Sequence, residues 1–145
     1  MSHRIDYKQV APKVFDALLS AQKQVNAGSL EPALVELVKI RASQINGCVY
    51  CLDMHCTEAR KAGEDSRRLD TLAAWRESPF FTPRERAALA WTEALTRLPE
   101  AGVSDALYAE VSQHFEPVQL AELTLVVTVI NSWNRFGVAF APALP

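Results

Sequence analysis

Residues 46–55 have the sequence NGCVYCLDMH, and the rest of the chain is organised around this segment. Cys48 and Cys51 are separated by two residues, and Glu36 precedes the first of them by twelve positions. A cysteine pair at this spacing can form a disulfide, bind a metal or carry electrons. The surrounding residues must therefore distinguish among these three chemistries.

The segment after Cys48 is rich in residues of high helix propensity. Residues three and four positions apart are neighbours on a helix, so Cys48, Cys51 and His55 are expected on one face. Cβ atoms at these spacings lie about 5–6 Å apart. A small local adjustment then suffices to close or open a Cys48–Cys51 disulfide.

Asn46 and Gly47 form a turn signal, which places Cys48 at or near a helix N-terminus. The free N–H groups and the dipole of that terminus favour an anion such as a thiolate. Such positions lower a cysteine pKa from about 8.5 to about 3.5–7.5. His55 follows one turn beyond Cys51, where it could accept the thiol proton or stabilise the thiolate.

Composition indicates one globular domain spanning residues 1–145, with 49% hydrophobic residues, 22% charged residues and a net charge of −2. No long basic run is present, so binding to nucleic acid or to an anionic membrane is not expected. The N-terminus lacks a signal-peptide pattern, and we expect a cytoplasmic location. In that reducing compartment, cysteines are catalytic, metal-binding or buried rather than a disulfide framework.

Hydrophobic periodicity predicts an all-α fold, because no segment alternates with period two. Pro12 is expected in a first helical turn, and Thr82 and Glu85 are expected to form a capping box. Residues 99–103 are predicted to be a loop. The predicted helices cover residues 6–27, 31–44, 47–62, 65–76, 82–98 and 104–115, and a last one of about twenty residues begins at Pro117.

The last predicted helix is apolar on nearly every side between Leu120 and Ile130. Such a helix is expected at the centre of the fold or in a subunit interface. It is too short, and too polar from Asn131 to Arg135, to span a membrane.

Three interpretations of the cysteines remain open from the residues alone. The first is a redox-active pair, and the second is a zinc site that combines Cys48, Cys51 and His55 with either Glu36 or Cys56. The third is a set of buried, inert cysteines. A thioredoxin fold is disfavoured because no βαβ pattern surrounds the motif, and the usual c-type haem motif would need a histidine directly after the second cysteine.

Residues 36–55, ELVKIRASQINGCVYCLDMH, resemble the AhpD-like alkylhydroperoxidase branch of the carboxymuconolactone decarboxylase family. The resemblance extends more weakly to AWTEAL at residues 90–95 and to INSWNRFGVAF at residues 130–140. It implies a single-domain AhpD-like helical bundle, with the core motif at about residues 30–63. It also implies a ring oligomer, either a homotrimer or a homohexamer.

The resemblance further implies an antioxidant peroxidase that reduces hydroperoxides. Cys51 matches the peroxidatic cysteine, which becomes a sulfenic acid, and Cys48 matches the resolving cysteine that closes the disulfide. Glu36 and His55 match the residues that relay the proton. An external dithiol, a lipoyl group on a carrier protein or another thiol reductant protein, would restore the thiols. No bound cofactor and no metal are expected.

The chain departs from the best-studied members at Tyr50, where they have a second histidine between the cysteines. Tyrosine donates a hydrogen bond but is a poor base near neutral pH, so the relay is expected to be shorter. Tyr50, Asn131, Asn134 and Arg135 are candidate pocket residues, although the last three could equally bridge helices. Cys56 is expected to be a buried small hydrophobic residue. The alternative function is a non-peroxidatic metal-binding or oligomeric interaction protein of the same fold.

Overall fold

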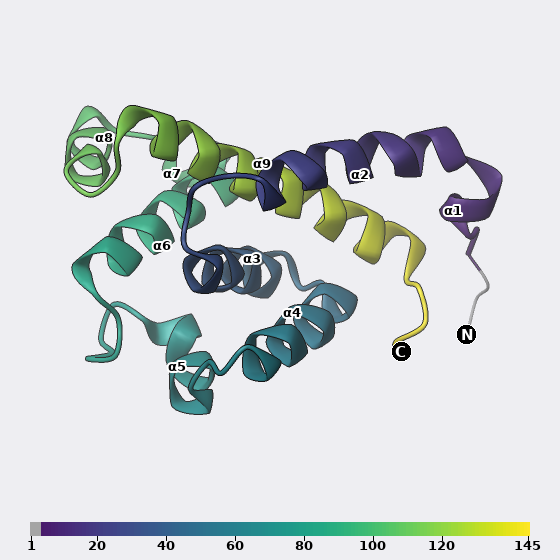
Figure 1. Cartoon of the computed structure of the whole chain (residues 1–145), viewed down its shortest axis with the longest axis horizontal. Coiled ribbons are helices and arrows are strands. Elements are labelled where there is room, and N and C mark those ends of the chain that lie inside the picture. Colours follow the sequence, from purple (N-terminus) through teal and green to yellow (C-terminus); the bar gives the residue numbers. More distant parts are fainter. Residues whose placement is uncertain (1–3) are drawn as a thin grey trace.

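The computed structural model describes residues 4–145, and within that range the chain forms helices and no β-strand (Figure 1). The predicted all-α fold is therefore confirmed. The expected single domain also includes residues 1–3, which lie outside the described residues. The elements are α1 (Tyr7–Val10), α2 (Pro12–Asn26), α3 (Pro32–Asn46), α4 (Val49–Lys61), α5 (Ser66–Thr71), the 3₁₀ turn η1 (Leu72–Ala74), α6 (Pro83–Thr96), α7 (Leu98–Ala101), α8 (Asp105–Ser112) and α9 (Pro117–Phe140).

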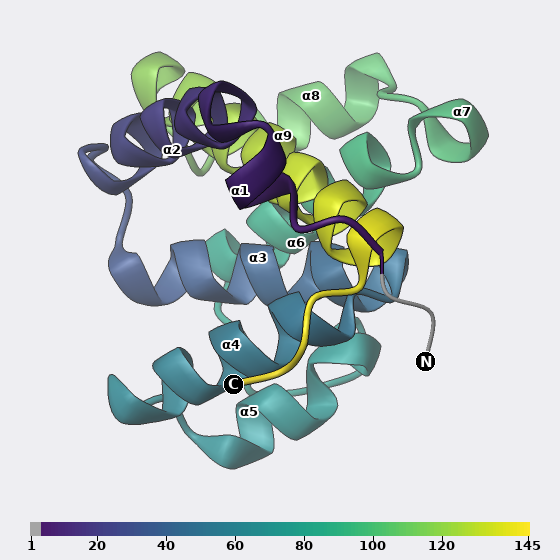
Figure 2. The ribbon, with the colours of Figure 1, turned by 90° about the vertical axis from the view of Figure 1, so that its right-hand side faces the viewer.

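Helices α3 and α9 occupy the centre of the molecule. Helix α3 packs against α4, α6 and α9, and α9 also packs against α2, α4, α6 and α8. Figure 2 shows α3 between α9 and α4, with α5 on the far side of α4. The cysteine segment therefore follows directly from one central helix and lies against the other.

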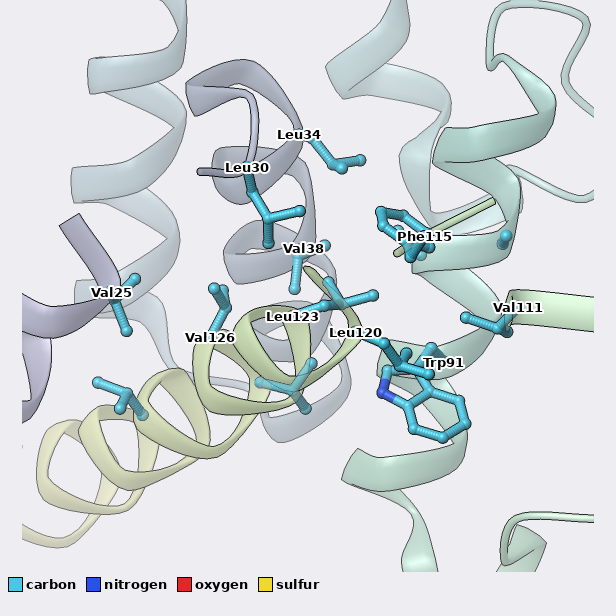
Figure 3. Packing of buried hydrophobic residues seen from close by; sticks show 14 residues of the cluster. Val25, Leu30, Leu34, Val38, Trp91, Val111, Phe115, Leu120, Leu123 and Val126 are labelled. Atoms are coloured by element: carbon cyan, nitrogen blue, oxygen red, sulfur yellow. The ribbon is translucent and has the colours of Figure 1, made fainter. Parts of the chain in front are cut away.

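The main hydrophobic core lies where α3, α6, α8 and α9 meet, and Figure 3 shows its side chains. Leu123 of α9 and Val38 of α3 are fully buried there, and Trp91 of α6 is nearly so. Burying a side chain of this size contributes about 1.5–3 kcal/mol. This packing confirms a central position for the last helix, although Val118 and Val138 on the same helix are exposed. Within residues 4–145, no helix has the length and hydropathy of a membrane span.

Two predicted boundaries were wrong. The helix predicted over residues 6–27 is divided at Ala11, whose φ of −139° and ψ of 62° are not helical. The cause is Pro12, because a proline disfavours the helical conformation in the residue before it. A loop was predicted over residues 99–103, but residues 99–101 belong to α7, a single helical turn (Leu98–Ala101) with Gly102 as its C-cap residue.

Capping residues explain where several helices begin. Thr82 and Glu85 form the predicted capping box at the start of α6. Asp65 and Ser104 accept backbone hydrogen bonds at the starts of α5 and α8. The start of α4 differs, because its N-cap residue is Cys48.

Candidate functional site

The turn between α3 and α4 brings the first cysteine to the start of a helix. Gly47 ends α3 in the left-handed conformation, with φ 65°, and its N–H donates to the carbonyl oxygens of Gln44 and Ser43. Glycine suits this position because it has no Cβ to clash with the backbone. Cys48 is then extended, and its Sγ accepts a hydrogen bond from the Cys51 N–H at 3.3 Å. The N-terminus of α4 is therefore directed at a sulfur atom.

Cys48 and Cys51 are joined as a disulfide, and their Cα atoms are 5.3 Å apart. Only 1% of Cys48 and 2% of Cys51 is exposed. The bond forms within the first turn of α4 and leaves the helix intact. The pair is thus shielded from bulk solvent and from bulky reactants.

A cavity of about 350 Å³ opens beside the disulfide, and Cys51, but not Cys48, contributes to its wall. His55 and Tyr50 from α4 and Lys39 from α3 also line it. This volume falls within the usual range for small-molecule sites. The aromatic and apolar part of the wall comes from Tyr7, Phe15, Leu19, Met54, Trp133 and Pro142.

Glu36 and His55 come from adjacent helices and form a hydrogen bond of 3.0 Å between Oε2 and Nδ1. Lys39 Nζ lies 3.4 Å from the other oxygen of the same carboxylate. Burial by itself raises the pKa of Glu36, but the hydrogen bonds and charges of His55 and Lys39 outweigh it and hold the pKa below its usual value. An ionised carboxylate at Nδ1 favours the tautomer with hydrogen on that atom, which leaves Nε2 to exchange protons.

Gly137 of α9 packs directly against the disulfide. A Cβ atom at this position would lie 2.5 Å from Cys48 Sγ and 3.4 Å from Cys51 Sγ. The helix can therefore approach the sulfur atoms only because residue 137 has no side chain. The sequence contains one signal for this role. Glycine lowers the stability of a helix interior, so a glycine inside a long helix suggests close packing at that position.

The candidate pocket residues of α9 lie elsewhere. Asn46 donates to the side-chain oxygens of Asn131 and Asn134, each at 2.9 Å, and thereby links α3 to α9. Asn134 is 1% exposed and donates to Ser43 Oγ. Arg135 donates to the backbone oxygen of Asn131 at 2.9 Å and is exposed. Of the four candidates, the structure brings only Tyr50 into the cavity beside Cys51.

Several residues of the cavity wall were missed by sequence reasoning. Tyr7 and Phe15 come from α1 and α2, and Trp133 comes from α9. The Tyr7 ring makes edge-to-face contacts with Phe15 and with Phe136 of α9, at centroid distances of 6.0 and 4.8 Å. Burial and the nearby Tyr50 and Asp6 raise the pKa of Tyr7, so its hydroxyl keeps its proton near neutral pH. No local pattern relates residues so distant in sequence.

Cys56 is half-buried and is not part of the disulfide. It packs against a second core cluster that includes Leu37, Ile40 and Leu72, so it contacts the core as predicted but is less buried than predicted. Burial raises the pKa of its thiol, which disfavours the reactive thiolate. Within residues 4–145, no three histidine, cysteine or acidic side chains converge in the manner of a metal site.

A separate cavity of about 410 Å³ lies beside α6, α7 and α8, away from the cysteines. Three of its charged groups are engaged, since Arg76 pairs with Glu93 and Arg86 donates to the Trp75 carbonyl oxygen, and Arg97 and Glu110 also line it. It contains neither a thiol nor an imidazole. The cavity beside Cys51, which both a cysteine and a histidine line, is therefore the better candidate for an active site.

Comparison with known proteins supplies independent context for this geometry. A model described as the carboxymuconolactone decarboxylase family matches residues 12–94. The uncharacterised protein YdfG of Bacillus subtilis is 41% identical over 139 residues, which cover 96% of this chain and 95% of YdfG.

Solved structures confirm the AhpD-like helical fold. A protein of unknown function from Agrobacterium tumefaciens, provisionally described as the antioxidant defence protein AhpD, superimposes with a TM-score of 0.96. It is 36% identical, and the match covers 99% of each chain. The debrominase Bmp8 has a TM-score of 0.82 at 20% identity, over 92% of this chain and 72% of Bmp8, which shows a shared fold alone.

Proposed function

This chain belongs to the carboxymuconolactone decarboxylase family, and from that premise we propose that it is a thiol-dependent peroxidase that reduces organic hydroperoxides. The observation that carries the proposal is the Cys48–Cys51 pair, because Cys51 lines a cavity together with His55, whose Nδ1 is hydrogen-bonded to Glu36. The A. tumefaciens structure, with its provisional link to antioxidant defence, supports the same assignment.

Cys51 is the attacking residue in this proposal because it contributes to the cavity wall. Its thiolate attacks the outer oxygen of the hydroperoxide, and the O–O bond breaks. The sulfur is oxidised to a sulfenic acid while the remaining oxygen leaves as an alkoxide. In the disulfide form the Cys51 N–H, at the start of α4, is directed at Cys48 Sγ.

In the proposed cycle His55 transfers the proton and Glu36 stabilises the protonated ring. His55 Nε2 takes the proton from the Cys51 thiol and returns it to the departing alkoxide, which gives an alcohol. Glu36 holds the other ring nitrogen at 3.0 Å and stabilises the positive charge that the ring carries between the two transfers. General acid–base catalysis of this kind contributes about 10²–10⁴-fold to a rate.

Cys48 resolves the sulfenic acid. Its thiol attacks Cys51 Sγ, water leaves, and the disulfide seen in the structure results. An external dithiol then attacks the sulfur of Cys51, the cysteine that lines the cavity, and releases the Cys48 thiolate at the N-terminus of α4. The second thiol of the reductant frees Cys51. A slender dithiol such as a lipoyl group on a carrier protein suits this buried bond.

The proposed setting is a cytoplasmic homotrimer or homohexamer. Large apolar side chains are exposed on helices at several edges of the monomer, including Val10, Val14, Tyr108 and Val118. A ring assembly, which the family resemblance implies, would bury part of this apolar surface. Light scattering on the purified protein would give the mass of the assembly, and a monomer at all concentrations would exclude the ring.

Steady-state turnover of cumene hydroperoxide with dihydrolipoamide tests the proposed function. Cys51→Ser is expected to abolish turnover, and Cys48→Ser is expected to leave a sulfenic acid or a mixed disulfide on Cys51. Cys56→Ser is the matched control and should keep wild-type activity, because Cys56 stands outside the pair. Full activity in both site variants would refute the proposal. Stoichiometric zinc in elemental analysis would instead favour the metal-binding alternative.

A further inference from the structure

The acidic and basic residues that line the cavity beside Cys51 are all basic. Lys8 and Lys39 line it, and no aspartate or glutamate of the described chain does so. Most of the remaining wall is apolar or aromatic and includes Phe15, Met54 and Trp133. A wall of this composition favours a ligand that has both an apolar body and a negative charge.

The two lysines differ in what they can offer to a ligand. Lys39 is buried, and its ammonium group pairs with the Glu36 carboxylate at 3.4 Å, so its charge already has a partner. Lys8 lies on α1 at the exposed edge of the cavity, where its Nζ is 5.1 Å from the centre of the Phe15 ring. In the described chain Lys8 has no acidic partner: the Asp6 carboxylate instead accepts the Lys8 backbone N–H.

We propose that this cavity selects amphipathic organic anions, with the carboxylate of the ligand at Lys8 and its apolar chain against Phe15 and Trp133. Together with the proposed peroxidase activity, on which this part rests, the substrate class becomes carboxylate-bearing organic hydroperoxides. A molecule about the size of water occupies roughly 30 Å³ of liquid. Hydrogen peroxide would therefore leave most of the 350 Å³ cavity unfilled.

Isothermal titration calorimetry on the oxidised protein tests this inference without any turnover. The probes are decanoate, decanol and decylamine, which share a chain and differ in the charge of the head group. Decanoate is expected to bind roughly fivefold more tightly than decanol, the gain typical of an exposed ion pair. Decylamine is expected to bind most weakly, because its ammonium group faces Lys8.

Charge reversal at the edge of the cavity supplies the decisive comparison. Lys8→Glu should invert the order, so that decylamine binds more tightly than decanoate. The control is Lys13→Glu, which changes an exposed lysine of α2 outside the cavity wall and should preserve the wild-type order. A variant that loses its fold would lose binding of all three probes and the helical circular dichroism signal, whereas inversion requires a folded cavity.

Equal binding of decanoate and decanol to the wild type would overturn the inference, as would an unchanged order in Lys8→Glu or no binding of any probe. These outcomes are separate from failure of the proposed function. A protein that binds decanoate through Lys8 and turns over no hydroperoxide would keep the ligand class and lose the peroxidase assignment. A protein that turns over cumene hydroperoxide with no preference for anions would keep the peroxidase assignment and lose the ligand class.

Discussion

Gly137 shows how much a single methyl group would matter beside the disulfide. A Cβ atom there would meet Cys48 Sγ at 2.5 Å, and a sulfur held in a disulfide cannot rotate away. Gly137→Ala is expected to cost the oxidised protein about 1–3 kcal/mol, the usual cost of overpacking. The reduced form should lose less, because a free thiol can change its rotamer.

The measurement for Gly137→Ala is the midpoint potential of the cysteine pair, followed with defined ratios of reduced and oxidised dithiothreitol. The variant should be easier to reduce than the wild type. Val138→Ala changes the adjacent, exposed residue and is expected to leave the potential unaltered. An unchanged potential in Gly137→Ala would show that α9 adapts to the added methyl group.

Glu36 is expected to act through His55 and not on the substrate itself. Glu36→Gln removes the negative charge at Nδ1, and we expect kcat/KM for the hydroperoxide to fall by roughly 10–100-fold. Because the pKa of Glu36 is held low, the wild type should show no loss of activity from this carboxyl between pH 5 and 8. Glu58→Gln, on the exposed surface of α4, is the control, and equal activity in the two variants would remove Glu36 from the relay.

At the scale of elements, the turn that joins α3 to α4 depends on a left-handed residue. Gly47 has φ 65°, and Gly47→Ala is expected to destabilise the protein by about 1–2 kcal/mol in urea unfolding. Gly47→Asn should recover part of that loss, because asparagine tolerates this conformation better than alanine. If alanine and asparagine had the same effect, backbone strain would not be the cause.

The helices and the start of the cysteine helix could be predicted from periodicity, propensity and turn residues. Cys48 at the N-terminus of α4 follows from Asn46 and Gly47 alone. The break at Ala11 was missed because the apolar period continues across it, whereas the backbone conformation is set by the following Pro12. Propensity and periodicity thus located the helices, but the effect of Pro12 on the preceding residue was needed to place the break at Ala11.

At the scale of the whole molecule, buried and paired carboxylates link stability to pH. Burial raises the pKa of Glu85 and Glu93, but hydrogen bonds from Arg68, and from Trp75 and Arg41, outweigh it and hold both pKa values below 4.5. The folded chain therefore binds protons less readily than the unfolded chain. Their contribution to the free energy of unfolding should be complete well above pH 4.5 and be lost as the pH falls through 4.5 and below the folded-state pKa values.

Urea unfolding monitored by circular dichroism between pH 3 and 7 checks this dependence. Glu93→Gln should flatten the acidic part of the curve, since its side chain no longer titrates, while it lowers stability at pH 7 through the lost charge opposite Arg41. Stability that increases toward low pH would contradict the sign of these shifts. A slope unchanged by Glu93→Gln would assign the effect to other carboxylates.

The cavity beside Cys51 could not be predicted from the sequence, because its wall combines residues from both ends of the chain. Tyr7, Phe15 and Trp133 meet only after α2 packs against α9. The pairing of Glu36 with His55 was implied by family resemblance, and the structure brings the two side chains together at 3.0 Å. The fold alone does not determine the substrate, since Bmp8 shares it and is described as a debrominase.

A thiol titration of the reduced protein, before and after one equivalent of cumene hydroperoxide, tests the proposed peroxidase cycle most directly. Peptide mass mapping would identify any disulfide that forms. Of the three cysteines, two are expected to disappear as a Cys48–Cys51 bridge that dihydrolipoamide reverses, and Cys56 should still titrate. If all three thiols still titrated after the peroxide had been added, the pair would not be a peroxidatic centre.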